Sequence, residues 1–125
     1  MDLSLPRSSI LRSRKDIEAL LESGDTLFRY PVKIYFLKKE DAAAPRMMVS
    51  VPKKNFHQAV DRNLLKRRIR ESFRLNRDAL EGVAADILFV YLGKEIEDYD
   101  IISKRIREGL RAVAQKCGAL TRDSE

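Results

Sequence analysis

The sequence predicts an α+β fold, a two-layer sandwich in which three helices pack on one side of a four-stranded mixed sheet. Apolar residues alternate or run together over four short segments, as in strands, and recur every three or four positions over three longer ones, as in helices. The order along the chain is helix, three strands, helix, strand, helix. A length of 125 residues suits one domain, which we expect to span residues 1–125.

The N-terminal part is expected to be a flexible arm followed by a short helix. Residues 1–12 contain a proline and several serines, which suit an extended segment. Ser13 and Asp16 have the spacing of a weak capping box, apolar residues follow at helical spacing, and Gly24 ends the helix. A helix this short requires a surface on which to pack.

The next part predicts three strands. Residues 25–37 form one or two strands that are interrupted at Pro31, and apolar side chains alternate along the second half. Residues 46–51 form the next strand, which Pro52 ends. The polar loop at 39–45 between them is expected to be a hairpin connection.

The C-terminal part predicts a buried strand and a long helix. Residues 86–92 are almost continuously apolar, as expected of an inner strand that is covered on both faces. Asp98 or Asp100 begins the last helix, and Gly118 ends it ahead of a frayed tail at 119–125. The apolar stripe of this helix consists of Ile102, Ile106, Leu110, Val113 and Cys117.

Between the third and fourth strands, residues 60–77 predict a helix with one apolar edge and one basic edge. Leu65, Ile69 and Phe73 fall on a single narrow stripe. A row of cationic and polar side chains climbs beside that stripe: Arg62, Asn63, Lys66, Arg67, Arg70, Arg74 and Arg77. The helix therefore has one edge for docking and one for a charged partner.

The positive charge of the chain is concentrated in this segment. The chain has 25 Lys and Arg against 19 Asp and Glu, a net charge of +6. Residues 53–77 hold nine basic residues and two acids, Asp61 and Glu71, for a net charge of +7, which leaves −1 for the remainder. Both acids are expected outside the basic row. Such a field attracts polyanions, most commonly a nucleic-acid backbone.

A basic helix can also be a solvated surface helix or a helix that lies on a membrane. A solvated surface helix usually interleaves acids with its basic residues, and the basic row lacks them. A helix that lies on an anionic membrane needs a broad apolar face, whereas this stripe is narrow and lacks Trp. A nucleic-acid partner is favoured over both, and no membrane partner is expected.

The sequence offers no recognisable catalytic or metal site. His57, the single histidine, has no nucleophile nearby, and Cys117 lies on an apolar stripe. Zinc-type spacing and a glycine-rich phosphate loop are absent, and the acids at 95–100 fit a helix start better than a metal. A single cysteine, no signal peptide and no apolar run of about 20 residues predict a cytoplasmic protein. We expect a binding protein.

The basic residues follow a distinctive order. They run Arg62-Asn63, Lys66-Arg67, Arg70 and Arg74, and they come after Lys53-Lys54 and Ala59-Val60. This order is similar to the arginine-rich motif of the protein subunit of bacterial ribonuclease P. The resemblance covers roughly residues 11 to 115.

The resemblance implies a fold and a task. The fold is an αβββαβα sandwich with a left-handed βαβ crossover around the basic helix, against the usual right-handed rule. The task is endonucleolytic removal of the 5′ leader from precursor tRNA, as an endoribonuclease subunit. The RNA subunit is the catalyst and uses bound Mg²⁺, and this chain binds that RNA, with a ratio of 1:1, together with the leader.

The resemblance also implies which residues act. The implied RNA-binding residues are Lys53, Lys54, Arg62, Asn63, Lys66, Arg67, Arg68, Arg70 and Arg74. The leader cleft is implied at Ile17, Leu21 and Tyr35, with Tyr35 available to stack on a base. Ile17 and Leu21 stand where the family often has aromatic residues, and Phe28 or Tyr30 is expected to compensate. A glycine usual after the lysine pair is replaced by Asn55-Phe56.

Two alternatives remain open at this point. The first is a general basic RNA chaperone or ribosome-associated protein that uses the same helix. The second is a self-sufficient nuclease, which the missing base and metal site disfavour.

Overall fold

The computed structural model describes residues 9–39 and 44–123. Its helices are α1 (Arg14–Ser23), α2 (Ala59–Asn76) and α3 (Tyr99–Asp123), and a short 3₁₀ helix, η2 (Arg77–Leu80), follows α2. Its strands are β1 (Asp25–Arg29), β2 (Val32–Lys38), β3 (Arg46–Ser50) and β4 (Ala85–Tyr91). The predicted α+β class and the order αβββαβα are confirmed.

The four strands form one mixed sheet in the order β1-β2-β4-β3. β1 pairs with β2 and β2 with β4, both antiparallel, whereas β3 and β4 are parallel and are joined through α2. The expected hairpin connection at 39–45 is wrong, because β4 lies between β2 and β3. β4 is buried at nearly every position, so it takes an inner place with a neighbour on each edge. The left-handed sense of the crossover stays a prediction.

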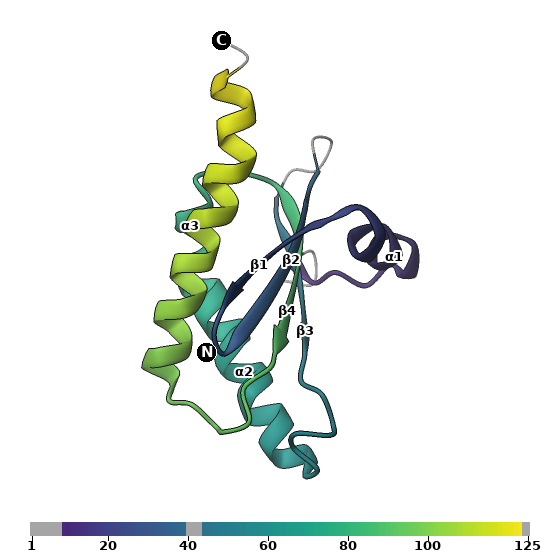
Figure 1. Cartoon of the computed structure of the whole chain (residues 1–125), viewed down its shortest axis with the longest axis vertical. Coiled ribbons are helices and arrows are strands. Elements are labelled where there is room, and N and C mark those ends of the chain that lie inside the picture. Colours follow the sequence, from purple (N-terminus) through teal and green to yellow (C-terminus); the bar gives the residue numbers. More distant parts are fainter. Residues whose placement is uncertain (1–8, 40–43, 124–125) are drawn as a thin grey trace.

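The main core lies between one face of the sheet and helices α2 and α3 (Figure 1). The predicted stripes are confirmed: Leu65, Ile69 and Phe73 of α2 are fully buried, and so are the stripe residues of α3. Gly109 lets α3 approach the sheet closely, since a Cβ there would lie 2.3 Å from Ile34 Cδ1. The two helices are therefore fixed against the sheet by well-packed side chains.

α1 lies on the opposite face of the sheet (Figure 1). Its Leu20 is buried with Leu11 and Leu88, and Ile17 and Tyr35 pack against this small cluster. The expectation that all helices lie on one side is therefore wrong for α1. The inner strand β4 carries apolar residues on both faces, and α1 covers part of the second one.

Both ends of the chain differ from the expected boundaries. Residues 1–8 of the expected arm lie outside the described residues, and Ile10 forms a parallel bridge with Met47 beside β3. Leu11 donates a backbone hydrogen bond to the Met47 carbonyl at 2.8 Å. α3 continues past Gly118, and the frayed state of the tail stays a prediction. Within the described ranges, no helix has the length and apolar character needed to cross a membrane.

Candidate nucleic-acid interface

The N-terminal end of α2 is fixed by one of its own arginines. Gln58, the N-cap residue, makes no side-chain capping bond. Instead Arg62 Nη1 donates to the carbonyl oxygens of Phe56 and His57, at 2.8 and 2.9 Å. Arg62 therefore holds the turn that leads from Lys53 and Lys54 into the helix.

The body of α2 is held from two sides. Its apolar stripe is fully buried, and the Phe73 ring meets the Phe89 ring edge-on with centroids 6.0 Å apart. On another side Arg68 Nη1 donates to the Glu97 carbonyl at 2.5 Å, in the connection between β4 and α3. Because this stripe is used by the core, it is not available to a membrane surface, which removes the support for that alternative.

The basic side chains of residues 53–77, taken together with Asn63, divide into two groups. Four make contacts within the protein: Arg62 and Arg68 as described, Arg74 with Glu71, and Arg77 with the Ser9 hydroxyl at 3.3 Å. In the part of the chain that the structure describes, the others make no hydrogen bond or ion pair: Lys53, Lys54, Asn63, Lys66, Arg67 and Arg70. We call these six residues the open basic row. Its four helical members lie within about 100° of arc.

Glu71 falls outside the arc of the basic row, as expected from helical geometry, but it pairs with Arg74 at the edge of that row. Arg74 Nε donates to Glu71 Oε2 at 3.2 Å, as expected for charges at i and i+3. Hydrogen bonding from Arg74 lowers the pKa of the Glu71 carboxyl, and the same bond raises the pKa of Arg74. The available positive charge therefore lies in the middle of α2, at Lys66, Arg67 and Arg70, and in the turn before it, at Lys53 and Lys54.

The face of the sheet that carries α1 is covered only in part. Strand register places Phe28, Lys33, Tyr35, Ser50 and Val90 on this face. Lys33 Nζ lies 4.9 Å from the centre of the Tyr35 ring, within range of a cation–π contact. α1 covers the end near Leu88 and leaves the end with Phe28 and Lys33 open. The uncovered part combines aromatic, apolar and cationic side chains.

The structure brings together two of the three predicted leader-cleft residues. Ile17 and Tyr35 pack in one cluster, whereas Leu21 is 51% exposed. Phe28 shares the face of Tyr35, and its ring meets the Tyr30 ring with centroids 6.1 Å apart. Lys33 is not among the leader-cleft residues that the sequence predicts. It stands two residues before Tyr35 in the same strand, so the two side chains lie on one face of the sheet.

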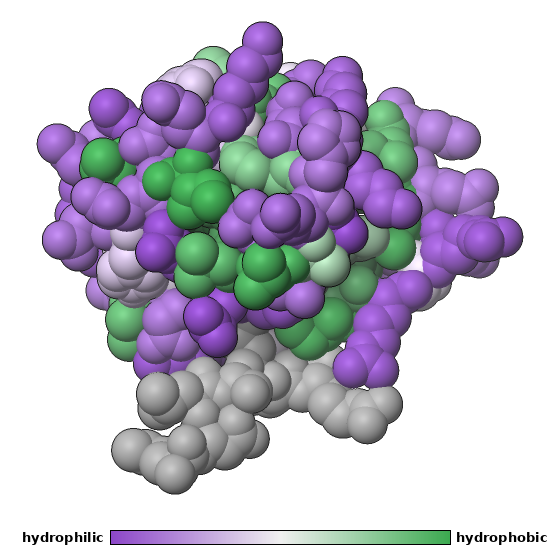
Figure 2. Space-filling view, turned by 90° about the horizontal axis from the view of Figure 1, so that it is seen from below, coloured by the Kyte–Doolittle hydropathy of each residue, from purple (hydrophilic) through white to green (hydrophobic). Residues whose placement is uncertain are grey.

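The lower end of the molecule in Figure 1 carries both hydrophilic and apolar side chains on its surface. Figure 2 views this end and shows many projecting hydrophilic side chains, with apolar residues gathered between them. Exposed apolar side chains occur at the start of α2, in the segment that leads into α3 and in the first turn of α3: Val60, Leu92, Ile96 and Ile101. They are distinct from the apolar stripe of α2.

The described residues offer no cluster that could hold a metal ion. Within residues 9–39 and 44–123, no three His, Cys, Asp or Glu side chains come together in a way that could hold a metal ion. His57 is exposed, and Cys117 is buried, which raises the pKa of its thiol and keeps it protonated.

Comparison with known proteins agrees with this geometry. The family model described as ribonuclease P matches residues 5–118. The ribonuclease P protein component of Porphyromonas gingivalis is 34% identical over 118 residues, which cover 88% of this chain and 86% of the relative.

Solved structures share the fold. The RNase P protein of Staphylococcus aureus has a TM-score of 0.72 at 22% identity, covering 86% of this chain and 95% of that chain. The RNase P protein from Thermotoga maritima has a TM-score of 0.72 at 26% identity, covering 82% and 96%. With the family model matched over most of its length, the chain belongs to the ribonuclease P protein family, the protein component of that endoribonuclease.

Proposed function

We propose that this chain binds the catalytic RNA of ribonuclease P and the 5′ leader of precursor tRNA, and so assists removal of the leader. The observation that carries the proposal is the open basic row, whose four helical members lie on a helix that the core holds in place. Six neighbouring polar side chains without partners in the described structure can approach a phosphate backbone with little rearrangement.

The RNA subunit contacts the open basic row. Each Lys or Arg of the row neutralises a phosphate and releases a counterion, whereas Asn63 can bond to phosphate or base. Arg62, Arg68 and Arg74 are already engaged within the protein and serve chiefly to hold α2 and its N-terminal turn in place. The predicted set of RNA-binding residues thus separates into contacting and positioning members.

The leader occupies the uncovered face beside α1. A single-stranded segment exposes base faces, and Tyr35 offers a ring on which one base stacks. Lys33 supplies a positive charge beside that ring for the adjacent phosphate. Ile17 and Phe28 add apolar contact on either side of Tyr35.

Mg²⁺ acts on the RNA subunit in this proposal. The described residues do not fit a magnesium site on the protein, because no three of their His, Cys, Asp or Glu side chains come together, and the carboxylates of Asp16 and Asp86 are already paired with Arg46 and Lys39. Catalytic groups therefore belong to the RNA, with one copy of the protein per RNA, in the cytoplasm where precursor tRNA is made.

The test is cleavage of a precursor tRNA at low Mg²⁺ with the RNA subunit alone, the protein alone, or both. We expect activity only with both, since the protein supplies leader binding and charge neutralisation and not the reacting groups. Activity of the protein alone would point to a self-sufficient nuclease. Absence of any rescue would point to a general RNA-binding protein.

A further inference from the structure

A buried carboxylate anchors an ion network on the α1 face of the sheet. Asp86, at the start of β4, has a side chain that is 1% exposed. Arg46 of β3 holds both of its oxygens, with Nε 2.9 Å from Oδ1 and Nη2 2.9 Å from Oδ2. Bidentate pairing of this kind fixes both distance and orientation.

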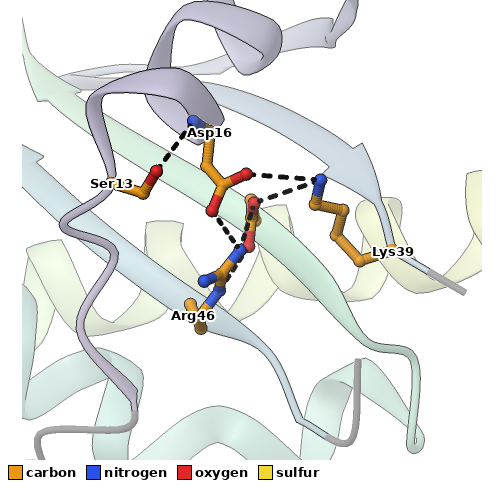
Figure 3. A network of polar contacts seen from close by, with 5 residues as sticks. Ser13, Asp16, Lys39 and Arg46 are labelled. Carbon is orange, nitrogen blue, oxygen red and sulfur yellow. Dashed lines mark hydrogen bonds and ion pairs between the residues drawn. The ribbon is translucent and has the colours of Figure 1, made fainter. Parts of the chain in front are cut away.

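The same cation reaches α1. Arg46 Nη2 lies 3.1 Å from Asp16 Oδ2, and Lys39 Nζ lies 3.8 Å from Asp16 Oδ1 and 3.9 Å from Asp86 Oδ2 (Figure 3). Asp16 belongs to the first turn of α1, and its backbone N–H donates to the Ser13 hydroxyl at 3.3 Å. We call Asp16, Lys39, Arg46 and Asp86 the α1 clamp, because they tie α1 to β3, β4 and the end of β2.

α1 has few other attachments. It is 10 residues long, and isolated helices below about 12–15 residues are marginal in water. Leu20 is its one fully buried side chain within the described structure. Two carboxylates face two cations in the clamp, so the buried charge of Asp86 is compensated. The position of α1 therefore depends on a small apolar cluster and on the clamp.

The clamp lies close to the proposed leader cleft. Asp86 pairs in register with Leu37, which is two residues from Tyr35 on the same face. Ile17, the residue after Asp16, packs in the cluster of Tyr35. We infer that the α1 clamp is a positioning device that sets the spacing between α1 and Tyr35, and thereby the affinity for the leader; this inference rests on the proposed function.

Asp16→Asn is the discriminating variant. It removes one carboxylate of the clamp but keeps the backbone cap at Ser13 and the buried pair of Asp86 with Arg46. By Coulomb attraction alone, loss of a negative charge near RNA would tighten binding. A positioning role predicts weaker binding of the precursor, because α1 would lose its ion pairs with Arg46 and Lys39. The sign of the change therefore separates the two explanations.

The matched control is Glu108→Gln. Glu108 pairs with Arg105 at 3.1 Å on α3, so this variant also removes one carboxylate from an ion pair. The affinity for a precursor tRNA with a 5′ leader and for mature tRNA would be measured with the reconstituted holoenzyme. We expect Asp16→Asn to weaken precursor binding by about two- to fivefold. Mature tRNA binding, the slope of affinity against salt and the cleavage rate at saturation should stay unchanged, and Glu108→Gln should alter none of these.

Two further measurements complete the test. Hydrogen exchange of the α1 amides should be faster in Asp16→Asn, with the amides of α2 unchanged. Tyr35→Ala, measured in parallel, reports on the cleft itself. If Tyr35→Ala weakens precursor binding but Asp16→Asn leaves it equal or tighter, the clamp does not position the cleft. If neither variant affects precursor binding, the proposed leader site is wrong and the inference fails with it.

Discussion

At the scale of single residues, the arginines of α2 differ in what they are free to do. Arg67 and Arg70 are exposed and have no partner in the described part of the chain, whereas Arg62 and Arg68 donate to backbone carbonyl oxygens. An arginine that already donates to a partly buried carbonyl contributes to the shape of the protein, and its removal takes that donor away. Identical side chains on one helix thus have distinct roles.

The salt dependence of RNA binding should separate these roles. Arg67→Ala and Arg70→Ala should each reduce the slope of log affinity against log salt by about 0.7–0.9, because each removes a phosphate contact. Arg68→Ala should leave the slope unchanged and lower the thermal midpoint. The measurement is binding to the RNA subunit over a KCl series. Arg111→Ala, an exposed cation on α3, is the control, and an equal loss of slope there would deny a special role to α2.

Tyr35 should discriminate between tRNA with and without a leader. Tyr35→Ala should weaken precursor binding by roughly fivefold or more, since stacking of one base contributes about 1–3 kcal/mol. Tyr35→Phe keeps the ring and should bind the precursor almost normally. Mature tRNA has no leader and should bind equally well in both variants. Equal weakening for precursor and mature tRNA would remove Tyr35 from the leader site.

At the scale of elements, α2 combines a fully buried stripe with an exposed basic row. A helix in the middle of a β-α-β connection is held by both strands that it joins, and here β3 and β4 are neighbours in the sheet. The stripe and the contact from Arg68 limit its rotation and translation. RNA binding consequently requires little ordering of the helix, which keeps the entropic cost of association low.

The docking of α2 can be tested by substitutions on its two sides. Phe73→Ala should lower the free energy of unfolding by about 3–5 kcal/mol, because it leaves a cavity in the main core. Leu75→Ala lies on the same helix at a side chain that is 55% exposed, and its effect should stay within about 0.5 kcal/mol. Urea unfolding of both variants measures the difference. A small effect of Phe73→Ala would contradict the packing of α2 described above.

At the scale of the whole molecule, the two faces of the sheet are used differently. One face is buried under α2 and α3 and supplies stability, while the other is shared between α1 and open surface. The inner strand β4 contributes side chains to both faces of the sheet. Tyr91, at the end of β4, connects the main core to the segment before α3. Its hydroxyl donates to the Glu95 carbonyl and accepts from the Glu97 N–H at 3.2 Å.

Alkaline unfolding should report on this link. Burial raises the pKa of the Tyr91 hydroxyl above 10.0, so the folded state holds this proton more tightly than the unfolded state. Its contribution to stability is therefore present below the ordinary tyrosine pKa and is lost as pH rises through the folded-state value. Tyr91→Phe should lose less stability than the unchanged protein between neutral and strongly alkaline pH. Leu75→Ala, at an exposed side chain without a titratable group, should follow the pH dependence of the unchanged protein in the same urea titrations.

The sequence by itself determined the order of elements, their buried stripes and the place of the positive charge. These properties are local, because the side chains of Leu65, Ile69 and Phe73 share a face through helical geometry alone, and those of Val32, Ile34 and Phe36 through strand geometry. The nine basic residues of 53–77 could likewise be counted without any knowledge of contacts. The similarity to a known family then supplied a task that no local pattern contains.

Only the tertiary structure decided how these elements meet. It put β4 between β2 and β3, placed α1 on the second face of the sheet, and engaged Arg62 and Arg68 while leaving Arg67 and Arg70 free. Each of these outcomes except the local contact of Arg62 depends on residues far apart in sequence. The α1 clamp is the clearest case, because it joins positions 16, 39, 46 and 86. Burial of Asp86 beside Arg46 is favourable only when the folded sheet brings both together, so no local pattern predicts it.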